Sequence, residues 1–541
     1  MLKNIWRIKE KTIDKKSGDW LTQVLAKNRN LKTQKELEDF LNPAFSKILQ
    51  VVPTDTKKAI ERIKKAISKK EKIVVYSDYD ADGITATAIV WETLHDLGAS
   101  VMPYVPHRIK EGYGLAIPAI EKLAKEGVKL IITVDNGVTA VEQVEAAKKL
   151  GVDVIITDHH VLPKVPPKSY ALVHTTELCG AGVAWRLCYD LVLDYKPDYE
   201  KNIIEKLELA AIATIADLVP LNSACRSIVK LGLEILPKTK RPGIKCLMRA
   251  SNIDGSVGTY EIGHILAPRI NAMGRIEHGL DSLRLLCTKK ADEAQRLASL
   301  LAKTNSKRQD LTSGAITSAL DLVDSGQLIG VVASEAWHEG VIGLVASRLV
   351  EAHHKPMVVI SRGQTRSKGS ARSIKGFNII EAIRESSEFL LDAGGHPMAA
   401  GFTIETRHIE SFAKKINVYA QTVLTEELLI PVIEIECPLA PSDITKHNFQ
   451  IIKKFEPFGM ANPEPIFITR GMTVEDVRTV GPTSAHLKLQ LDGINAIAFN
   501  RGSLLSQLRP GYMVDAVYTI AADKYNGNDG LQLKIKDIEI K

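Results

Sequence analysis

Cysteine is scarce in this sequence and nowhere paired. The six cysteines are scattered, with no C-x-x-C pair and no framework spacing. Without such spacing the chain lacks the signature of a structural zinc site or of a disulfide scaffold. The pattern favours a protein that works in a reducing compartment.

Long uninterrupted apolar runs are also missing. The most apolar stretch, LELAAIATIADLVPL at 207–221, is broken by Glu208 and Asp217, and the N-terminal MLKNIWRIKEKTIDKK carries charges throughout. These features exclude a membrane span or a signal peptide on the usual criteria. Internal repeats and low-complexity tracts are absent as well. We therefore expect a soluble cytoplasmic protein with no membrane partner.

The overall composition is that of a globular protein. The chain has 541 residues, of which 45% are hydrophobic and 25% charged, which is enough for two to four domains with their own cores. Lys and Arg exceed Asp and Glu by 71 to 64, giving a net charge of +7. This mild excess suits a polyanionic partner without requiring one.

Buried strands alternate with amphipathic helices from Lys72 onward. Apolar, β-branched runs alternate with helical patterns, which predicts a doubly wound, largely parallel sheet. The expected strands are 72–77, 100–105, 129–134 and 153–157, and the expected helices are 84–97, 117–127 and 139–150.

The second half of the chain changes character twice. The charged, Ala- and Leu-rich segment 285–325 predicts a long connecting helix, and a second α/β pattern follows it. The last hundred or so residues contain short β-type runs separated by Gly, Pro and Asn, which predicts a small β-barrel.

Acidic and imidazole side chains follow several of the predicted strands. Asp78, Asp80 and Asp82 end the first, and Asp135 follows a later one; DHH at 158–160 and Asp217 complete the set. Any one of these aspartates is more simply explained as a helix N-cap. Together they would meet at one edge of a parallel sheet and repel each other unless cations were present. Oxygen and imidazole ligands favour Mn²⁺ or Mg²⁺, and two such ions are typical of phosphoester hydrolysis.

Several segments also carry side chains suited to binding a phosphate. Arginine forks and Ser/Gly loops bind phosphate oxygens, although each segment alone is equally well explained as surface charge. The candidates are Arg108, Tyr113, Arg269, Asn271, Arg275, Lys368, Ser370, Arg372 and His396.

An ordered series of motifs resembles the DHH phosphoesterases, and within them the RecJ single-stranded-DNA exonucleases. The series is DYDADG, PHRIKEGYGL, VDNG, DHH, ADLVPL, APRINAMGRI, WHEGVIGLVASRLVE, KGSARSI, GGHPMAAGF and FEPFGMANPEPIF. It covers nearly the whole chain after about residue 45. Met273, Ala371 and Ala461 depart from the family pattern, the last two standing where glycine is usual.

The resemblance implies a domain order. It implies an N-terminal segment (1–45), a DHH catalytic domain (46–284), a connecting helix (285–325), a DHHA1-type α/β domain (326–425) and a C-terminal OB-fold β-barrel (426–541).

The resemblance also assigns roles to individual residues. The metal ligands would be Asp80, Asp82, Asp135, His159 and Asp217, with Asp135, His160 and His396 as catalytic residues. Asp78 and Asp158 would have supporting roles. The substrate contacts, including a pocket for the 5′-phosphate, would be Arg108, Tyr113, Arg269, Asn271, Arg275, Ser370, Arg372 and His396.

The function so implied is a 5′-to-3′ exonuclease specific for single-stranded DNA, which releases 5′-mononucleotides with two Mn²⁺ or Mg²⁺ ions in DNA repair and recombination. Its expected partners are single-stranded DNA with a 5′ end, a RecQ-type helicase and a single-strand-binding protein, and the chain is expected to be a monomer. Two alternatives stay open: a DHH phosphodiesterase acting on oligonucleotides or cyclic dinucleotides, and a non-catalytic RecJ-like replication factor.

Overall fold

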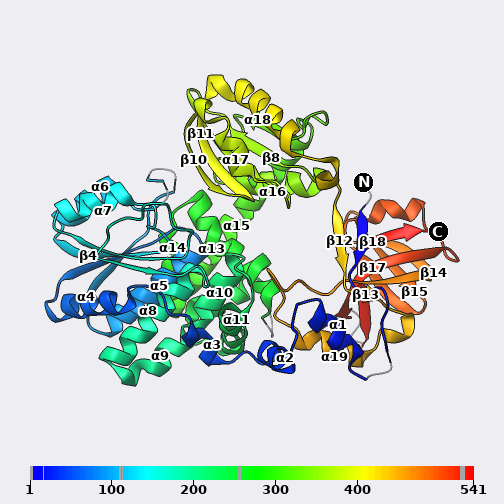
Figure 1. The fold of residues 1–541 in the computed structure, drawn as a ribbon, viewed down its shortest axis with the longest axis horizontal. Coiled ribbons are helices and arrows are strands. Elements are labelled where there is room, and N and C mark those ends of the chain that lie inside the picture. The colour runs from blue at the N-terminus through cyan, green and yellow to red at the C-terminus, as the bar shows by residue number, and fades with distance from the viewer. Residues whose placement is uncertain are drawn as a thin grey trace.

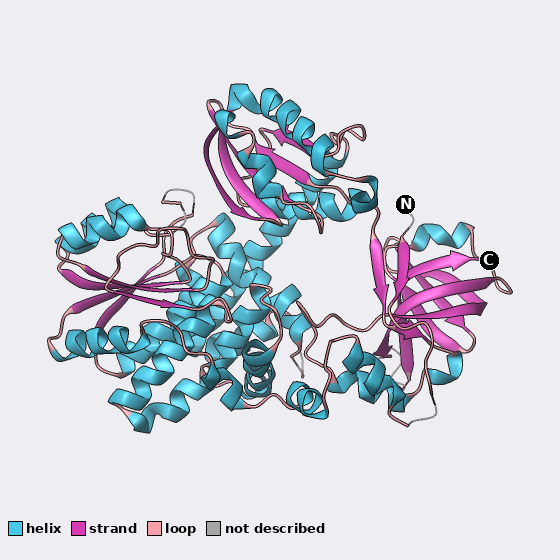
Figure 2. Ribbon diagram, in the orientation of Figure 1, coloured by secondary structure: helices cyan, strands magenta, loops and turns pink. Residues whose placement is uncertain are grey.

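The computed structural model describes residues 4–15, 18–108, 111–112, 114–253, 255, 257–523 and 530–541. These residues form three lobes (Figures 1 and 2). An α/β lobe with a large helical part is the first lobe, a smaller α/β unit is the second lobe, and a β-barrel is the third. A long helix, α15 (Ala291–Leu320), leads from the first lobe to the second.

The sheet of the first lobe is fully parallel and has the strand order β3-β2-β4-β5-β6. Residues of β2 alternate between two cores: Ile73 and Val75 belong to one face, Val74 and Tyr76 to the other. Helices cover both faces, so the predicted doubly wound fold is confirmed. The strands are β2 (Lys72–Tyr76), β3 (Ser100–Tyr104), β4 (Val128–Val134), β5 (Asp153–Asp158) and β6 (Ala171–His174); the helices are α4 (Thr56–Ser68), α5 (Ala81–Asp96) and α8 (Gly180–Tyr195) on one face, α6 (Ile117–Lys125) and α7 (Val141–Lys149) on the other.

A bundle of further helices extends this lobe. Helix α10 is apolar around its whole circumference and is buried from Leu207 to Ile215, because α5, α8 and α11 all pack against it. The helices are α3 (Phe45–Gln50), α9 (Glu200–Glu205), α10 (Leu207–Ala216), α11 (Ser223–Ile235), α12 (Pro242–Arg249), a π-helix (Glu261–Leu266), α13 (Ala267–Ile276) and α14 (Leu280–Cys287).

The second lobe has a mixed sheet in the order β10-β11-β9-β8-β7. The strands β7 and β8 pair in parallel, whereas β9, β10 and β11 are joined by antiparallel pairings. Its elements are β7 (Gly330–Ser334), α16 (Ile342–His353), β8 (Met357–Ser361), β9 (Arg366–Arg372), α17 (Ile379–Arg384), β10 (Leu390–His396), β11 (Ala399–Glu405) and α18 (Ile409–Val423).

The third lobe is a closed barrel, because β14 pairs with both β15 and β17. The predicted C-terminal β-barrel is therefore confirmed. Its elements are β12 (Val432–Ile435), β13 (Cys437–Pro438), α19 (Lys446–Lys454), β14 (Phe467–Val480), β15 (His486–Leu491), β16 (Ile494–Ala498), β17 (Met513–Ala522) and β18 (Leu531–Ile540).

The N-terminal segment packs on this distant barrel. Its elements are β1 (Ile5–Ile8), α1 (Trp20–Lys27) and α2 (Gln34–Leu41). Trp20 and Leu21 share a core with Phe455 and Phe467, and β1 pairs in parallel with β12. The first residues of the chain therefore pack on the C-terminal barrel, although the first two lobes separate these segments in the sequence. No helix among the described residues is long and apolar enough to cross a membrane.

A buried arginine joins these parts. Arg226 on α11 is 1% exposed, and its guanidinium donates to the carbonyl oxygens of Phe40, Phe455, Glu456 and Pro457 at 2.7–3.1 Å. It also lies 3.8 Å from the centre of the Phe40 ring. Burial, followed by the charge of Arg29, lowers its pKa to about 10. One side chain thus connects the first lobe, the N-terminal segment and the barrel.

We expect Arg226→Met to weaken this junction by about 3–5 kcal/mol, because four carbonyl groups lose a buried charged donor. Urea denaturation should show the loss, and limited proteolysis should cut between the first lobe and the barrel. Arg348→Met, at an exposed position of α16, is the matched control and should leave both measurements unchanged. An unchanged unfolding midpoint for Arg226→Met would contradict the role of this arginine.

Candidate metal centre

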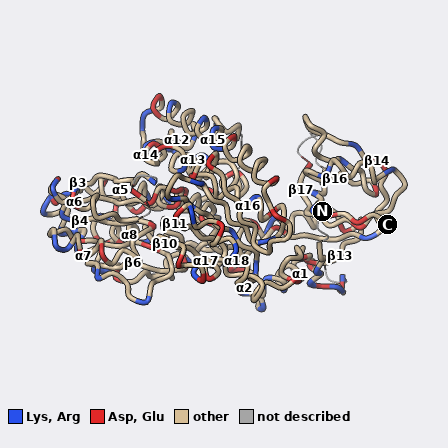
Figure 3. Tube along the Cα trace, turned by 90° about the horizontal axis from the view of Figure 1, so that it is seen from above, with Lys and Arg blue, Asp and Glu red and all other residues tan. Residues whose placement is uncertain are grey.

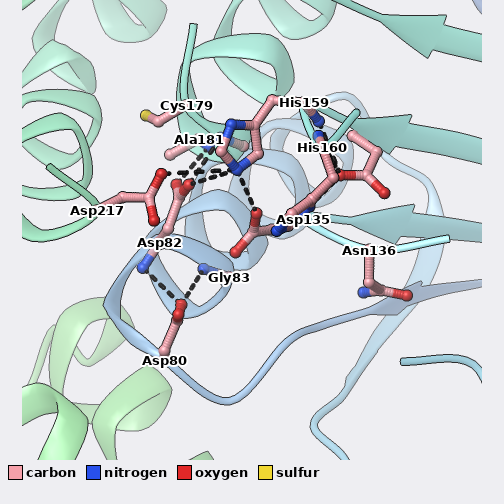
Figure 4. Close-up of polar contacts among 12 residues, drawn as sticks. Asp80, Asp82, Gly83, Asp135, Asn136, His159, His160, Cys179, Ala181 and Asp217 are labelled. Carbon is pink, nitrogen blue, oxygen red and sulfur yellow. Dashed lines mark hydrogen bonds and ion pairs between the residues drawn. The ribbon is translucent and has the colours of Figure 1, made fainter. Parts of the chain in front are cut away.

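The carboxyl ends of β2, β4 and β5 bring acidic and imidazole side chains together, as Figure 4 shows. Asp80 and Asp82 come from the start of α5, Asp135 follows β4, and His159 follows β5. Asp217 is the C-cap of α10, which ends beside them. The structure therefore places all five predicted metal ligands in one cluster.

Backbone N–H groups hold two of these carboxylates. Asp80 is the N-cap of α5, and its Oδ1 accepts hydrogen bonds from the backbone of Asp82 at 3.0 Å and Gly83 at 3.1 Å. Asp82 accepts from the backbone of Gly180 and Ala181 at 2.7 Å each, at the start of α8. The helix that was expected from Ile84 begins at Ala81 because of this cap. The helix-cap interpretation of Asp80 is thus also correct.

His159 lies at the centre of the cluster. Its Nε2 is 3.2 Å from Asp135 Oδ1, 3.6 Å from Asp217 Oδ2 and 3.8 Å from Asp82 Oδ2. The same nitrogen is buried and makes no hydrogen bond within the described part of the chain. Burial, followed by the charge of His160, lowers the pKa of His159 to about 4. The ring is therefore neutral at pH 7 and can offer a lone pair to a cation.

Asp135 is held in an unusual backbone conformation. Its φ is +61°, in the left-handed region that Asp tolerates better than most residues, and its N–H donates to the carbonyl oxygen of Thr157 at 3.0 Å. Gly180 leaves room for it, because a Cβ there would lie 2.6 Å from Asp135 Oδ1. Substitution of this glycine would displace either the start of α8 or Asp135.

Asp158 orients the next histidine. It accepts hydrogen bonds from the backbone N–H groups of Val138, His159 and His160, and its Oδ1 lies 2.7 Å from His160 Nδ1. Burial opposes protonation of His160, but the hydrogen bond and charge of Asp158 outweigh it and raise the His160 pKa to about 9. The ring of His160 is nearly parallel to that of His396 on β10 of the second lobe, with centroids 6.1 Å apart. His160 is thus a fixed positive group that faces the second lobe.

Four carboxylates of the cluster, Asp78, Asp82, Asp135 and Asp217, are protonated more readily than usual. Burial, then the charge of Asp80, raises the pKa of Asp82 to about 7, and burial, then Asp82, raises that of Asp217 to about 8. Burial also raises the pKa values of Asp78 and Asp135 well above the normal range. Asp82 is 1% exposed and Asp135 is 2% exposed.

These donors fit divalent cations. Three groups, Asp82–His159–Asp217, Asp135–His159–His160 and Asp78–Asp80–Asp135, each have ligand atoms within 4.8 Å of one another. Oxygen-rich ligands with one imidazole suit Mn²⁺ and Mg²⁺. Cations would compensate the repulsion that burial imposes on the carboxylates. Asp78, which was expected only to support the ligands, also lies within reach of this cluster.

Arginines from both lobes gather beside the loop that carries Asp78 and Asp80. The guanidinium of Arg108 lies 5.0 Å from the centre of the Tyr79 ring, and Arg372 on β9 donates to Ser370 Oγ at 3.2 Å. Burial, then Arg108 and Arg372, lowers the pKa of Arg275 to about 10. None of these three arginines forms an ion pair with a described residue. The charge of Asp80 opposes this repulsion at Arg275.

The second lobe can approach because a glycine lies at the contact. A Cβ at Gly340 would lie 2.2 Å from the carbonyl oxygen of Arg275. Within the second lobe, Gly343 on α16 leaves room for Arg372, since a Cβ there would lie 2.9 Å from Arg372 Nη2. Lys and Arg are otherwise spread over all parts of the chain and mixed with Asp and Glu (Figure 3). The arginine cluster is thus a local feature that the net charge does not reveal.

The other predicted substrate contacts have varied positions. Asn271 accepts a hydrogen bond from the backbone of Ala81 at 2.7 Å and so positions the loop that carries Asp80 and Asp82. Arg269 donates to the carbonyl oxygen of Ile265 at 2.8 Å, while its buried Nε has no partner in the described chain. His396 is exposed. Tyr113 lies outside the described residues.

Some site residues had no motif to reveal them. The pKa of Arg308 on α15 is lowered mainly by burial and also by the charge of Arg269, so the two guanidinium groups lie close together. Gly180 and Ala181 contribute backbone groups alone, so no side-chain pattern could identify them. At the family departures, Ala371 and Met273 are buried, and Ala461 has φ +62°, where glycine would be less strained.

Comparisons with known proteins agree with this geometry. Family models match as the DHH family, N-terminal domain (residues 72–216), the DHHA1 domain (residues 325–422) and the RecJ OB domain (residues 435–537). The single-stranded-DNA-specific exonuclease RecJ of Bacillus subtilis is 40% identical over 90% of this chain, which spans 63% of that protein. The Escherichia coli RecJ is 31% identical, with 89% of both chains covered.

Solved structures give the same result. The crystal structure of Thermus thermophilus RecJ with Mn²⁺ superposes with a TM-score of 0.86 at 29% identity, covering 99% of this chain and 79% of that one. The Mg²⁺ complex gives a TM-score of 0.79 at 28% identity, covering 99% and 78%. The expected order of DHH, DHHA1 and OB-type domains is confirmed. From its sequence, its domains and its fold, the chain belongs to the RecJ family of single-stranded-DNA-specific exonucleases.

Proposed function

We propose that this chain is a metal-dependent exonuclease that degrades single-stranded DNA from its 5′ end and releases 5′-mononucleotides, in DNA repair and recombination. The observation that carries the proposal is the contact of His159 Nε2 with three carboxylates at 3.2–3.8 Å, beside arginines that lack ion-pair partners among the described residues. Cations and a phosphate fit between these two sets of charges. The curated RecJ relatives are named as enzymes of this specificity.

The metal ligands would be Asp80, Asp82, Asp135, His159 and Asp217, holding two divalent cations, Mn²⁺ or Mg²⁺. Asp135 and His159 each belong to two of the three donor groups, but only the carboxylate of Asp135 has two oxygens, so Asp135 would be the ligand able to bridge two ions. When bound, such ions lower the pKa of water and polarise the phosphate. Asp78 and Asp158 would support these ligands, Asp158 by fixing the ring of His160.

The protein's own groups bind and orient the DNA. His160 and His396 would flank the reacting phosphate from the two lobes, with His160 contributing a positive charge. Arg108, Arg269, Ser370 and Arg372 would bind the terminal 5′-phosphate. Arg275, Asn271 and Tyr113 complete the proposed substrate contacts. The barrel would hold the strand that follows, as OB-folds do.

This reading is preferred to both alternatives. A cyclic dinucleotide or a short oligonucleotide would not need a barrel that binds a strand. A non-catalytic RecJ-like factor would be expected to lack metal ligands, whereas all of the proposed ones are present and clustered. The domain limits, a monomeric state, the cytoplasmic location and the two protein partners, a RecQ-type helicase and a single-strand-binding protein, remain proposals.

Asp135→Ala should reduce cleavage of 5′-labelled single-stranded DNA on the order of 10³-fold, since it removes the proposed bridging ligand. A chelator should abolish the activity of the unaltered protein, and Mn²⁺ should restore it. Asp310→Ala, at an exposed position of α15, is the control and should retain full activity. Release of label only from the 3′ end would contradict the proposed polarity.

Arg372→Ala should mainly weaken the preference for a 5′-phosphate. Loss of one charge-assisted hydrogen bond of about 1.5–3 kcal/mol corresponds to roughly 10–100-fold. The measurement compares kcat/KM on otherwise identical strands with and without the 5′-phosphate. Arg366→Ala, exposed on the same strand β9, should leave the preference intact. Equal losses on the two substrates would remove Arg372 from the phosphate pocket.

Stability without metal should fall as pH rises. Asp82 and Asp217 have pKa values of about 7 and about 8 in the folded protein, compared with about 3.9 in an unfolded chain. The stability that these two carboxylates contribute is fully present below their pKa in the unfolded chain, and it disappears as pH rises through their pKa values in the folded protein. The thermal midpoint in a chelator should therefore drop between about pH 5 and pH 8.

Added Mn²⁺ should reverse this trend, because the deprotonated carboxylates bind it. Asp217→Asn is the internal check, since it should flatten the pH dependence measured in chelator. A midpoint that rises with pH in the chelator would show that these carboxylates are not protonated in the folded protein.

A further inference from the structure

The inward face of the connecting helix α15 changes from apolar to polar where the helix passes from the first lobe to the second (Figure 1). Its residues from 294 to 301 belong to the core of the first lobe, and those at 315 and 319 belong to a core of the second. Asn305, Arg308 and Thr312 lie between them. The positions of this face are 294, 298, 301, 305, 308, 312, 315 and 319, in the alternating steps of four and three that keep side chains on one side of a helix.

Arg308 is half-buried at the centre of this polar break, and its side chain is held in place. Its Nη2 donates a hydrogen bond to Asn305 Oδ1 at 2.8 Å, and its backbone carbonyl oxygen accepts one from Thr312 Oγ1 at 2.7 Å. The other terminal nitrogen, Nη1, has no hydrogen-bond partner among the described residues and, unlike Nε, retains exposed surface. Arg308 therefore keeps one accessible donor group.

The charged neighbours of Arg308 are arginines from both lobes. Arg269 comes from α13 of the first lobe and Arg348 from α16 of the second; after burial, the largest cause, their charges lower the pKa of Arg308. No described carboxylate opposes this repulsion at Arg308 or at Arg269. Guanidinium groups that gather without carboxylates repel one another, so this cluster favours an anion.

The position of Arg308 also argues against a purely structural role. An apolar side chain at 308 would complete the buried face of α15, and it would remove the repulsion from Arg269. Replacement of a buried charge by an apolar group is often neutral or stabilising. Folding alone therefore does not require an arginine at this position.

Arg269 indicates which anion the cluster would bind. It belongs to the set of residues that would bind the terminal 5′-phosphate, and its Nη1 is held by the carbonyl oxygen of Ile265 at 2.8 Å. Arg308 lies beside it and is held by Asn305. Two fixed guanidinium groups from different helices can donate to different oxygens of one phosphate.

We propose that Arg308 binds the terminal 5′-phosphate of the DNA strand together with Arg269. The inference rests on the proposed function and deepens it, because it adds a residue of the connecting helix to a pocket otherwise built from the two lobes. A phosphate bound there would contact the first lobe, the second lobe and the helix that joins them. The 5′-phosphate would thus help to fix the lobes in the arrangement that cleavage needs.

Binding of single-stranded oligonucleotides to the full chain in a chelator tests this proposal without cleavage. Fluorescence anisotropy compares two strands of one sequence, the first with a 5′-phosphate and the second with a 5′-hydroxyl group. We expect the unaltered protein to prefer the phosphorylated strand. Arg308→Leu should reduce this preference about tenfold, the effect of one charge-assisted hydrogen bond, and should change the affinity for the unphosphorylated strand little.

Thermal unfolding without DNA separates this role from a structural one. Arg308→Leu should keep or raise the thermal midpoint, because leucine completes the apolar face and removes the repulsion. Asn305→Asp places a carboxylate beside Arg308, which should raise the midpoint and also weaken the preference for the 5′-phosphate. A lower midpoint for Arg308→Leu together with an equal loss of affinity for both strands would identify Arg308 as structural and overturn the proposal.

Arg296→Leu, at an exposed position of the same helix, is the matched control and should leave the preference unchanged. Full retention of the preference by Arg308→Leu would also overturn the proposal. Failure of the unaltered protein to bind either strand would contradict the proposed function itself, and the inference with it.

Discussion

The repulsion between buried carboxylates at one sheet edge is the constraint on which the rest of this structure depends. Asp82 and Asp135 are almost completely buried, and Asp78, Asp80 and Asp217 lie close by. Such a cluster persists only when its members are fixed by the fold and compensated by protons or cations. The fold supplies the first condition through backbone N–H groups at the starts of α5 and α8, and through Gly180, which leaves space for Asp135. Cations supply the second, which explains why a fold with a well-packed apolar core retains so unfavourable an arrangement.

The arginines form the complementary half of the same arrangement. Arg275 comes from the first lobe and Arg372 from the second, and close packing of Gly340 on the backbone of Arg275 brings the two lobes together. A cluster of unpaired guanidinium groups is unfavourable by itself for the same electrostatic reason as the carboxylates. In the proposed function a bound phosphate would relieve the arginines, and cations would relieve the carboxylates. The two lobes would then fit one another best with the charges of metal and substrate between them.

Much of this could be predicted from the sequence because the signals are local. The alternation of buried strands and helices gives the parallel sheet, and the ends of parallel strands must meet, so the clustering of Asp80, Asp135 and His159 follows from the topology. In the C-terminal part, the alternating β-type runs HLKLQL and LQLKIKDIEI form strands β15 and β18. The packing of Trp20 on the barrel and the bridging role of Arg226 depend on contacts across most of the chain, which no local pattern encodes. The hydrogen bonds that Asp82 accepts from two backbone N–H groups of α8 could not be predicted either, since the side chains of Gly180 and Ala181 carry no polar group.

Asp82 and Asp217 lie at opposite kinds of helix end. Asp82 lies at the start of α5 and accepts two more N–H groups from the start of α8, so positive dipole ends favour its charged form. Asp217 caps the end of α10, where the carbonyl groups make the local potential negative. Backbone hydrogen bonds from Gly180 and Ala181 oppose the rise in the pKa of Asp82, whereas burial and then the charges of Asp82 and Asp80 raise that of Asp217. A cation beside Asp217 would gain from both the carboxylate and the carbonyl end of α10. The arrangement makes Asp82 a ligand fixed in advance and Asp217 a ligand that cation binding completes.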